Sequence, residues 1–169
     1  MKGNVIRNMK PVDEDFLRML SRYQGIIHKV NLIYFNTPED RKDNFQEVVC
    51  QLWKSFPSLK DSGKTGSWIY AVAINVSISK IRKDSKYVFT DSIPEITHTG
   101  DVDRIERDMD FSRLLNAIRS FNKTDRSIML LYLEEYSYSE IAEIMGISVS
   151  HVGVKIHRLT GRLQKHFKI

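Results

Sequence analysis

The sequence predicts an all-α protein made of two small helical domains joined by an acidic linker. Apolar residues recur at helical spacing on both sides of the middle of the chain, there is no sustained strand pattern of period two, and the segment between the halves is polar and acidic. We expect one domain over residues 10–85, the linker over 86–110 and a second domain over 111–169. The alternative is one domain with a long surface loop, although structureless loops of this length are uncommon inside compact domains.

The N-terminal half contains three apolar stripes with helical spacing. The middle stripe follows positions i, i+3, i+4, i+7, i+8 and i+11 from Phe45, which predicts a helix over residues 38–56 that Pro57 ends. The three stripes consist of Phe16, Leu17, Leu20, Tyr23, Ile27, Val30 and Ile33; of Phe45, Val48, Val49, Leu52, Trp53 and Phe56; and of Trp68, Ile69, Val72, Ala73, Val76 and Ile81. Two glycines in a polar run predict a loop over residues 58–66, between the second and third helices.

The sharpest local pattern lies in the C-terminal half. Ser137 and Glu140 have the S-x-x-E spacing of a capping box at the start of a helix. Gly146 suits the left-handed conformation that ends a helix, and Ser148 can cap the next helix. Two helices joined by a short turn that contains glycine predict a helix-turn-helix.

The second helix of this pair has two distinct faces. Val152, Ile156, Leu159 and Leu163 fall on one side and should face the core. The opposite side combines short residues, which allow close approach to a major groove, with cations that reach phosphates or guanine edges. The candidate DNA-binding residues there are Ser148, Ser150, His151, Val154, Lys155, Arg158 and Arg162. Val154 either touches a thymine methyl group or is a tolerated exposed valine.

Charge is distributed unevenly along the chain. The 169 residues carry 26 Lys and Arg against 21 Asp and Glu, a net charge of +5. Residues 84–110 hold eight acids and three bases, so this segment carries −5 and the rest carries +10. From Ser148 to the end there is no acidic residue beside five Lys and Arg. The two helical halves therefore suit an anionic partner, whereas the segment between them does not.

Several functional classes are excluded by the same inspection. No run approaches the 18 or so apolar residues that span a bilayer, and no secretory signal follows the first charges, so we expect a cytoplasmic protein without membrane insertion. Cys50 is the single cysteine, which rules out an internal disulfide or a zinc cluster, and we expect no metal and no cofactor. The common catalytic motifs are absent, and Gly63-Lys64-Thr65 lacks the upstream glycine of a phosphate-binding loop, so we expect no enzymatic activity.

Three passages together resemble the sigma-70 family, specifically the two-domain extracytoplasmic-function type of bacterial RNA polymerase sigma factor. Residues 43–53 (DNFQEVVCQLW) are similar to its D-x-x-Q-E-x-F-x-x-x-W helix, and residues 68–75 (WIYAVAIN) to its W-L-Y-x-I-A-x-N helix. Residues 138–158 are similar to its turn and recognition helix. The resemblance covers nearly all of residues 15–166. The chain departs from the pattern at Asn44, Thr65, Gly153 and Lys155.

The resemblance implies a sigma factor that directs core RNA polymerase to specific promoters and initiates transcription. It implies contacts with the β′ clamp and the β subunit, with promoter DNA and with an anti-sigma factor, and an acidic linker that threads toward the RNA exit channel. The implied polymerase-binding residues are Asp43, Gln46, Glu47 and Lys54. The implied minus-ten DNA-binding residues are Lys60, Lys64, Asn75, Lys80, Arg82, Lys83 and Lys86, and the C-terminal helix would read the minus-thirty-five element. The alternative is a polymerase-independent helix-turn-helix regulator, which would not copurify with polymerase.

Overall fold

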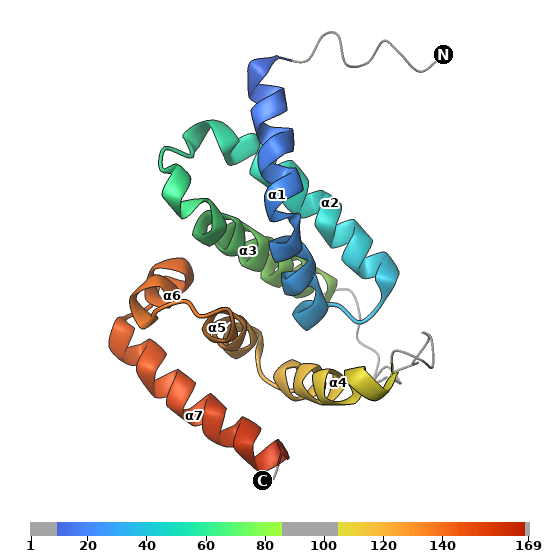
Figure 1. Cartoon of the computed structure of the whole chain (residues 1–169), viewed down its shortest axis with the longest axis vertical. Coiled ribbons are helices and arrows are strands. Elements are labelled where there is room, and N and C mark those ends of the chain that lie inside the picture. The colour runs from blue at the N-terminus through green and yellow to red at the C-terminus, as the bar shows by residue number, and fades with distance from the viewer. Residues whose placement is uncertain (1–9, 86–104, 168–169) are drawn as a thin grey trace.

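The computed structural model describes residues 10–85 and 105–167, and both parts are built from helices (Figure 1). The N-terminal half consists of α1 (Pro11–Tyr34), α2 (Pro38–Ser55), two short 3-10 turns (Phe56–Ser58 and Ser62–Lys64) and α3 (Thr65–Ser85). The C-terminal half consists of α4 (Ile105–Arg119), α5 (Lys123–Leu133), α6 (Tyr138–Met145) and α7 (Val149–Phe167). The described residues contain no strand, and the all-α prediction is confirmed.

Local sequence explains where the first helices begin. Pro11 and Pro38 both occupy the first turn of their helices, where a missing N–H costs nothing. The Thr37 hydroxyl accepts a hydrogen bond from the Asp40 backbone at 3.1 Å and so caps α2. Helix α2 therefore has almost the bounds expected from the apolar stripe. In α1, by contrast, Leu17 is half-exposed, although the stripe included it.

A buried polar network ties the first three helices together. Asn44 on α2 is fully buried, and its side-chain nitrogen donates to Asn31 Oδ1 at 2.7 Å and to Ser77 Oγ at 2.9 Å. Asn31 and Ser77 belong to α1 and α3, and Asn31 also donates to the Arg41 carbonyl at 3.0 Å. Buried polar groups of this kind need their partners, so the network fixes how the three helices register against one another.

The two halves are docked through the C-terminal end of α1. Helix α1 has no basic residue in its own last turn, and arginines from the other half supply the missing donors. Arg119 Nε and Nη2 donate to the Leu32 carbonyl at 2.9 and 2.7 Å, and Arg126 Nη1 donates to the Ile33 carbonyl at 3.2 Å. Burial lowers the pKa of both guanidinium groups.

The Tyr34 hydroxyl adds a buried contact at the same place. It donates to the Lys123 carbonyl at 2.6 Å and also hydrogen-bonds Ser127. Burial raises the pKa of Tyr34 to about 12. One cluster of buried apolar side chains continues from α1–α3 through α4–α7. Helix α4 begins at Ile105, so its first turns fall inside the segment expected as linker, and residues 86–104 of that segment lie outside the described residues.

Candidate nucleic-acid interface

The turn between α6 and α7 has the caps that the sequence predicts. Ser137 Oγ accepts from the Glu140 backbone at 3.2 Å, and Glu140 Oε2 accepts from the Ser137 backbone at 2.8 Å. The backbone donor at Ser137 lowers the pKa of Glu140. Gly146 ends α6 with φ of +66°, and Ser148 Oγ accepts from the His151 backbone at 3.2 Å at the start of α7. The predicted helix-turn-helix is confirmed at each of these positions.

Helix α7 separates its side chains as the sequence predicts. Val152, Ile156 and Leu159 are buried against α5 and α6, and Leu163 is partly buried. Most of the candidate DNA-binding residues of this helix and its cap are exposed, namely Ser148, Ser150, His151, Val154, Arg158 and Arg162. Val154 is 67% exposed, the largest exposed fraction among the big apolar side chains of the described residues. This face has no carboxylate of its own.

All three candidate cations on α7 have partners within the protein. Lys155 Nζ lies 2.7 Å from Asp125 Oδ1, and the Lys155 side chain is only 15% exposed. The guanidinium of Arg162 lies over the Phe121 ring at 4.6 Å, a cation–π contact that leaves the residue exposed. Arg158 remains 58% exposed, with Nη2 at 3.4 Å from Asp125 Oδ2. Helical spacing predicts on which side of a helix a residue lies, but it does not identify the residue from elsewhere in the chain that contacts it. The sequence therefore gives no sign of Asp125.

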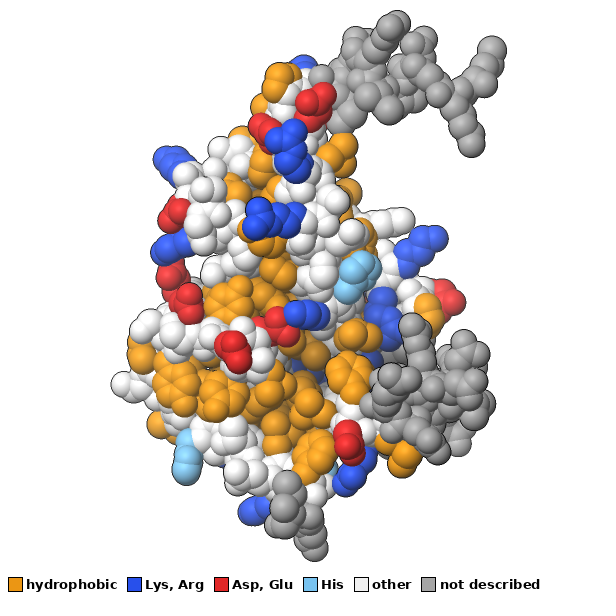
Figure 2. All heavy atoms as spheres, viewed as in Figure 1, with side chains coloured by type: hydrophobic (Ala, Val, Ile, Leu, Met, Phe, Trp, Pro, Cys, Tyr) orange, Lys and Arg blue, Asp and Glu red, His pale blue; other side chains and the backbone are white. Residues whose placement is uncertain are grey.

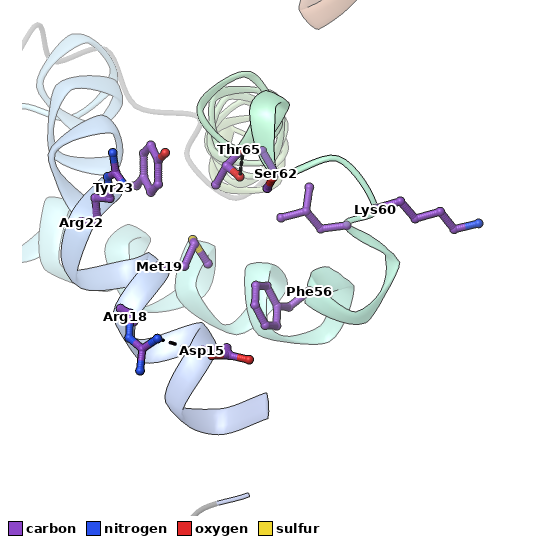
Figure 3. Close-up of a pocket in the computed structure, with 10 residues that line it drawn as sticks. Asp15, Arg18, Met19, Arg22, Tyr23, Phe56, Lys60, Ser62 and Thr65 are labelled. Atoms are coloured by element: carbon purple, nitrogen blue, oxygen red, sulfur yellow. Dashed lines mark hydrogen bonds and ion pairs between the residues drawn. The ribbon is translucent and has the colours of Figure 1, made fainter. Parts of the chain in front are cut away.

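The N-terminal half has a hollow beside the predicted loop (Figure 3). Its volume is about 390 Å³, and α1, the 3-10 turn after α2, the loop and the first residue of α3 line it. Tyr23 and Phe56 contribute aromatic rings to its lining, and Arg18 and Arg22 contribute cations, of which Arg18 turns toward Asp15. The two arginines are not among the residues predicted from the sequence, although their spacing of four places them on one face of a helix. Lys60 belongs to the rim, and its side chain extends away from the hollow.

The other candidates for minus-ten contact are spread along α3. Lys64, just before α3, is exposed but pairs with Glu143 of α6 at 2.9 Å, and this hydrogen bond raises the pKa of Lys64. Asn75 is exposed on the middle of α3 and Lys80 is half-buried. Arg82 and Lys83 are exposed at its end, and Lys86 lies outside the described residues.

Asp43, Gln46, Glu47 and Lys54 are all exposed on α2. A groove of about 420 Å³ between α2 and α3 brings Glu47 and Lys54 together with Asn75. Candidates assigned to different partners therefore share one groove. Trp53, a member of the predicted apolar stripe, is 43% exposed and packs edge-on against Phe16 with ring centroids 5.0 Å apart.

One face of the C-terminal half is apolar rather than basic. Figure 2 shows hydrophobic side chains gathered over the region of α5 and α6. Tyr132, Leu133 and Tyr138 are exposed there by 37%, 44% and 41%, and the two tyrosine rings lie 6.5 Å apart. Contiguous exposed apolar surface of this kind is typical of a protein contact. No helix in the described parts of the chain combines the length and the hydropathy needed to cross a bilayer.

Two family models match the chain. The model for sigma-70 region 2 matches residues 19–87, and the model for sigma-70, region 4 matches residues 111–160. The two matches together cover more than half of the 169 residues and include residues 149–160 of α7 and the groove between α2 and α3.

Curated proteins with similar sequences come from the same functional group. The chain is 27% identical over 161 residues to the RNA polymerase sigma factor YlaC of Bacillus subtilis, with 90% of each chain covered. It is 25% identical over 177 aligned positions to the ECF RNA polymerase sigma factor SigW of the same organism, with 96% of this chain and 95% of that protein covered.

Solved structures share the fold at lower identity. The sigma factor RpoE, in complex with the anti-sigma factor NepR from Bartonella quintana, has a TM-score of 0.71 at 19% identity, and 92% of this chain and 98% of that chain are covered. CnrH, in complex with the cytosolic domain of CnrY, has a TM-score of 0.63 at 14% identity, and the covered shares are 90% and 86%.

Proposed function

The chain belongs to the sigma-70 family, as an RNA polymerase sigma factor of the extracytoplasmic-function type, and from this premise we propose how its two halves divide promoter recognition. The N-terminal domain, over residues 10–85, docks on the β′ clamp of core RNA polymerase and opens the minus-ten element. The C-terminal domain, over residues 111–169, inserts α7 into the major groove of the minus-thirty-five element. Residues 86–110 form the acidic connection between them.

The exposed face of α7 is the observation that supports this division best. It follows a capped turn, it carries no carboxylate, and it presents short side chains before cations. Short residues such as Ser150 let the helix backbone approach base edges, and Arg158 and Arg162 then lie further along the groove. Val154, at the centre of the face, makes apolar contact with a thymine methyl group. Ser148 and His151, at the start of the helix, contact the sugar-phosphate backbone of the DNA.

The N-terminal half contacts two partners through neighbouring surfaces. Asp43, Gln46, Glu47 and Lys54 bind the polymerase clamp from α2, and Asn75 lies across the shared groove on α3. DNA at the minus-ten element is bound by Asn75 and by the cations Lys60, Lys64, Lys80, Arg82, Lys83 and Lys86. Because Glu47, Lys54 and Asn75 line one groove, docking on polymerase fixes where the separated strand is held.

The apolar patch of Tyr132, Leu133 and Tyr138 binds protein. Its residues belong to α5 and the start of α6 and not to α7, so the β subunit can bind this patch while α7 binds DNA. An anti-sigma factor that covers this patch would compete with polymerase. The protein acts in the cytoplasm by binding alone, without a reaction of its own.

In vitro transcription tests this function directly. Purified protein and core polymerase from the source bacterium are incubated with genomic fragments, and RNA start sites are mapped with and without the protein. We expect new starts that require it, and copurification with core polymerase. A protein that binds duplex promoter DNA tightly alone and ignores polymerase would instead be a conventional regulator.

A matched pair of charge reversals tests the docking surface. Glu47 and Glu39 are both exposed on α2, but only Glu47 lies in the groove. We expect E47K to weaken binding to core polymerase by roughly tenfold, the loss typical of a contact charge, while E39K binds as the unmodified protein does. Equal behaviour of the two variants would place the docking surface elsewhere.

A further inference from the structure

A buried carboxylate lies directly beneath the DNA-facing helix. Asp125, in the first turn of α5, is 1% exposed and points toward α7. Its Oδ1 accepts from Lys155 Nζ at 2.7 Å, and its Oδ2 accepts from Asn122 Nδ2 at 2.8 Å and from Arg158 Nη2 at 3.4 Å. An ionised carboxylate at such depth is tolerated only with charge partners and hydrogen bonds.

The two cations that contact this carboxylate differ in exposure and in the number of N–H donors that remain free for DNA. Lys155 is 15% exposed and directs its ammonium group at Asp125, whereas Arg158 is 58% exposed. A guanidinium has five N–H donors in a rigid fork, so one weak contact with Asp125 leaves most of them free. Lys155 could reach a phosphate only by leaving the buried carboxylate with Arg158 as its one cation.

We propose that Lys155 acts on DNA binding only through Asp125, an inference that rests on the proposed function of α7. Lys155 neutralises the buried carboxylate, and the neutralised carboxylate holds the Arg158 guanidinium at the DNA-facing surface. Lys155 and Asp125 are thus positioning residues, and Arg158 is the group that touches DNA. Without Lys155, only Arg158 would balance the negative charge that lies under the face that must approach phosphates.

A double-mutant cycle on the free protein tests the pairing. K155M removes the ammonium group and keeps the length of the side chain, and D125N removes the opposing charge and keeps the hydrogen-bonding shape. We expect K155M to lower the melting temperature by about 10 °C, as loss of one partner of a buried pair does, and D125N/K155M to recover most of that loss. K165M, at an exposed lysine of α7, serves as the control and should change the melting temperature little.

The same variants then decide the role in DNA binding. Holoenzyme is reconstituted with core polymerase, and its affinity for a promoter fragment found by start-site mapping is measured between 50 and roughly 200 mM salt. We expect K155M to bind roughly tenfold more weakly, D125N/K155M to return close to the unmodified affinity, and the double variant to keep the unmodified salt dependence. The amide oxygen introduced at position 125 can still accept from Arg158.

A direct phosphate contact would give a different result. The double variant would then stay as weak as K155M, and the slope of log affinity against log salt would shrink by about 0.9, the value of one phosphate contact. Either result, with the unmodified holoenzyme binding normally, would refute the positioning role of Lys155 and leave the proposed function of α7 intact. Failure of the unmodified holoenzyme to bind any fragment would instead refute the proposed function and the inference with it.

Discussion

Replacement of Arg119 by alanine should destabilise the whole protein, although Arg119 belongs to neither candidate interface. Its guanidinium donates twice to the Leu32 carbonyl, at 2.9 and 2.7 Å, and lies 3.5 Å from the Phe35 carbonyl. These carbonyls end α1 and have no donor within their own helix. R119A removes both Arg119 donors from the Leu32 carbonyl, whereas the Phe35 carbonyl still accepts from Arg41 Nη1 at 3.3 Å.

The expected size of the effect follows from these contacts. A hydrogen bond from a charged group contributes about 1.5–3 kcal/mol, and two such bonds to one carbonyl count for less than twice that value. Burial, and then the neighbouring charges of Arg41 and Arg126, lower the pKa of Arg119, which shows that holding this charge here has a cost. We expect R119A to lower the free energy of unfolding by about 2–3 kcal/mol, or the melting temperature by roughly 5–10 °C.

Denaturant titration followed by circular dichroism measures this difference. R18A is the control, because Arg18 is 80% exposed in its side chain and lies 3.9 Å from Asp15, a pair worth less than about 1 kcal/mol. The unfolding free energy of R119K should lie between those of R119A and R18A, because a lysine ammonium keeps the charge but lacks the planar set of donors of a guanidinium. If R119A is no less stable than R18A, the arginine does not hold the end of α1 and the docking of the halves has another cause.

Three further predictions concern single groups. Gly146 has φ of +66°, so G146A should lower the free energy of unfolding by about 1 kcal/mol. Gly161 has open space where a side chain would begin, so G161A should raise the free energy of unfolding by about 1 kcal/mol. Denaturant titration measures both changes. The pKa of Tyr34 is raised to about 12, so its share of the stability is complete below pH 10 and is lost as pH rises from 10 to 12. A Y34F variant should show a shallower decline of the unfolding free energy over that interval, and an unchanged decline would contradict the assignment. S137A should cost about 1 kcal/mol through loss of the α6 cap, whereas S139A, at an exposed position in the same helix, should cost less than half of that.

Local structure was predictable where neighbouring residues determine it. Ser137, Gly146 and Ser148 act on backbone groups within a few positions of themselves, so their spacing alone predicts the helix-turn-helix. The α2 helix follows in the same way from Pro38 and a regular apolar stripe. Leu17 shows the limit, because a residue one step from Phe16 lies about 100° around the helix and can leave the core.

Contacts between distant residues could not be read from the sequence. Arg119 meets the end of α1 across 87 positions, and Lys64 meets Glu143 across 79. Periodicity says which side of a helix is apolar, but it says nothing about which polar group from elsewhere will lie against it. For the same reason, the sequence pattern predicts Lys155 as a DNA contact and gives no sign of its partner Asp125, 30 positions earlier.

The shared core has a thermodynamic consequence for the two family regions. Since one cluster of buried side chains runs through both halves, neither region can unfold without exposing apolar surface of the other, and their melting should be one cooperative transition. Both tryptophans, Trp53 and Trp68, lie in the N-terminal half. Their fluorescence therefore reports on the unfolding of α7, and any molecule that stabilises the recognition helix should raise the melting temperature measured by tryptophan fluorescence of the other half.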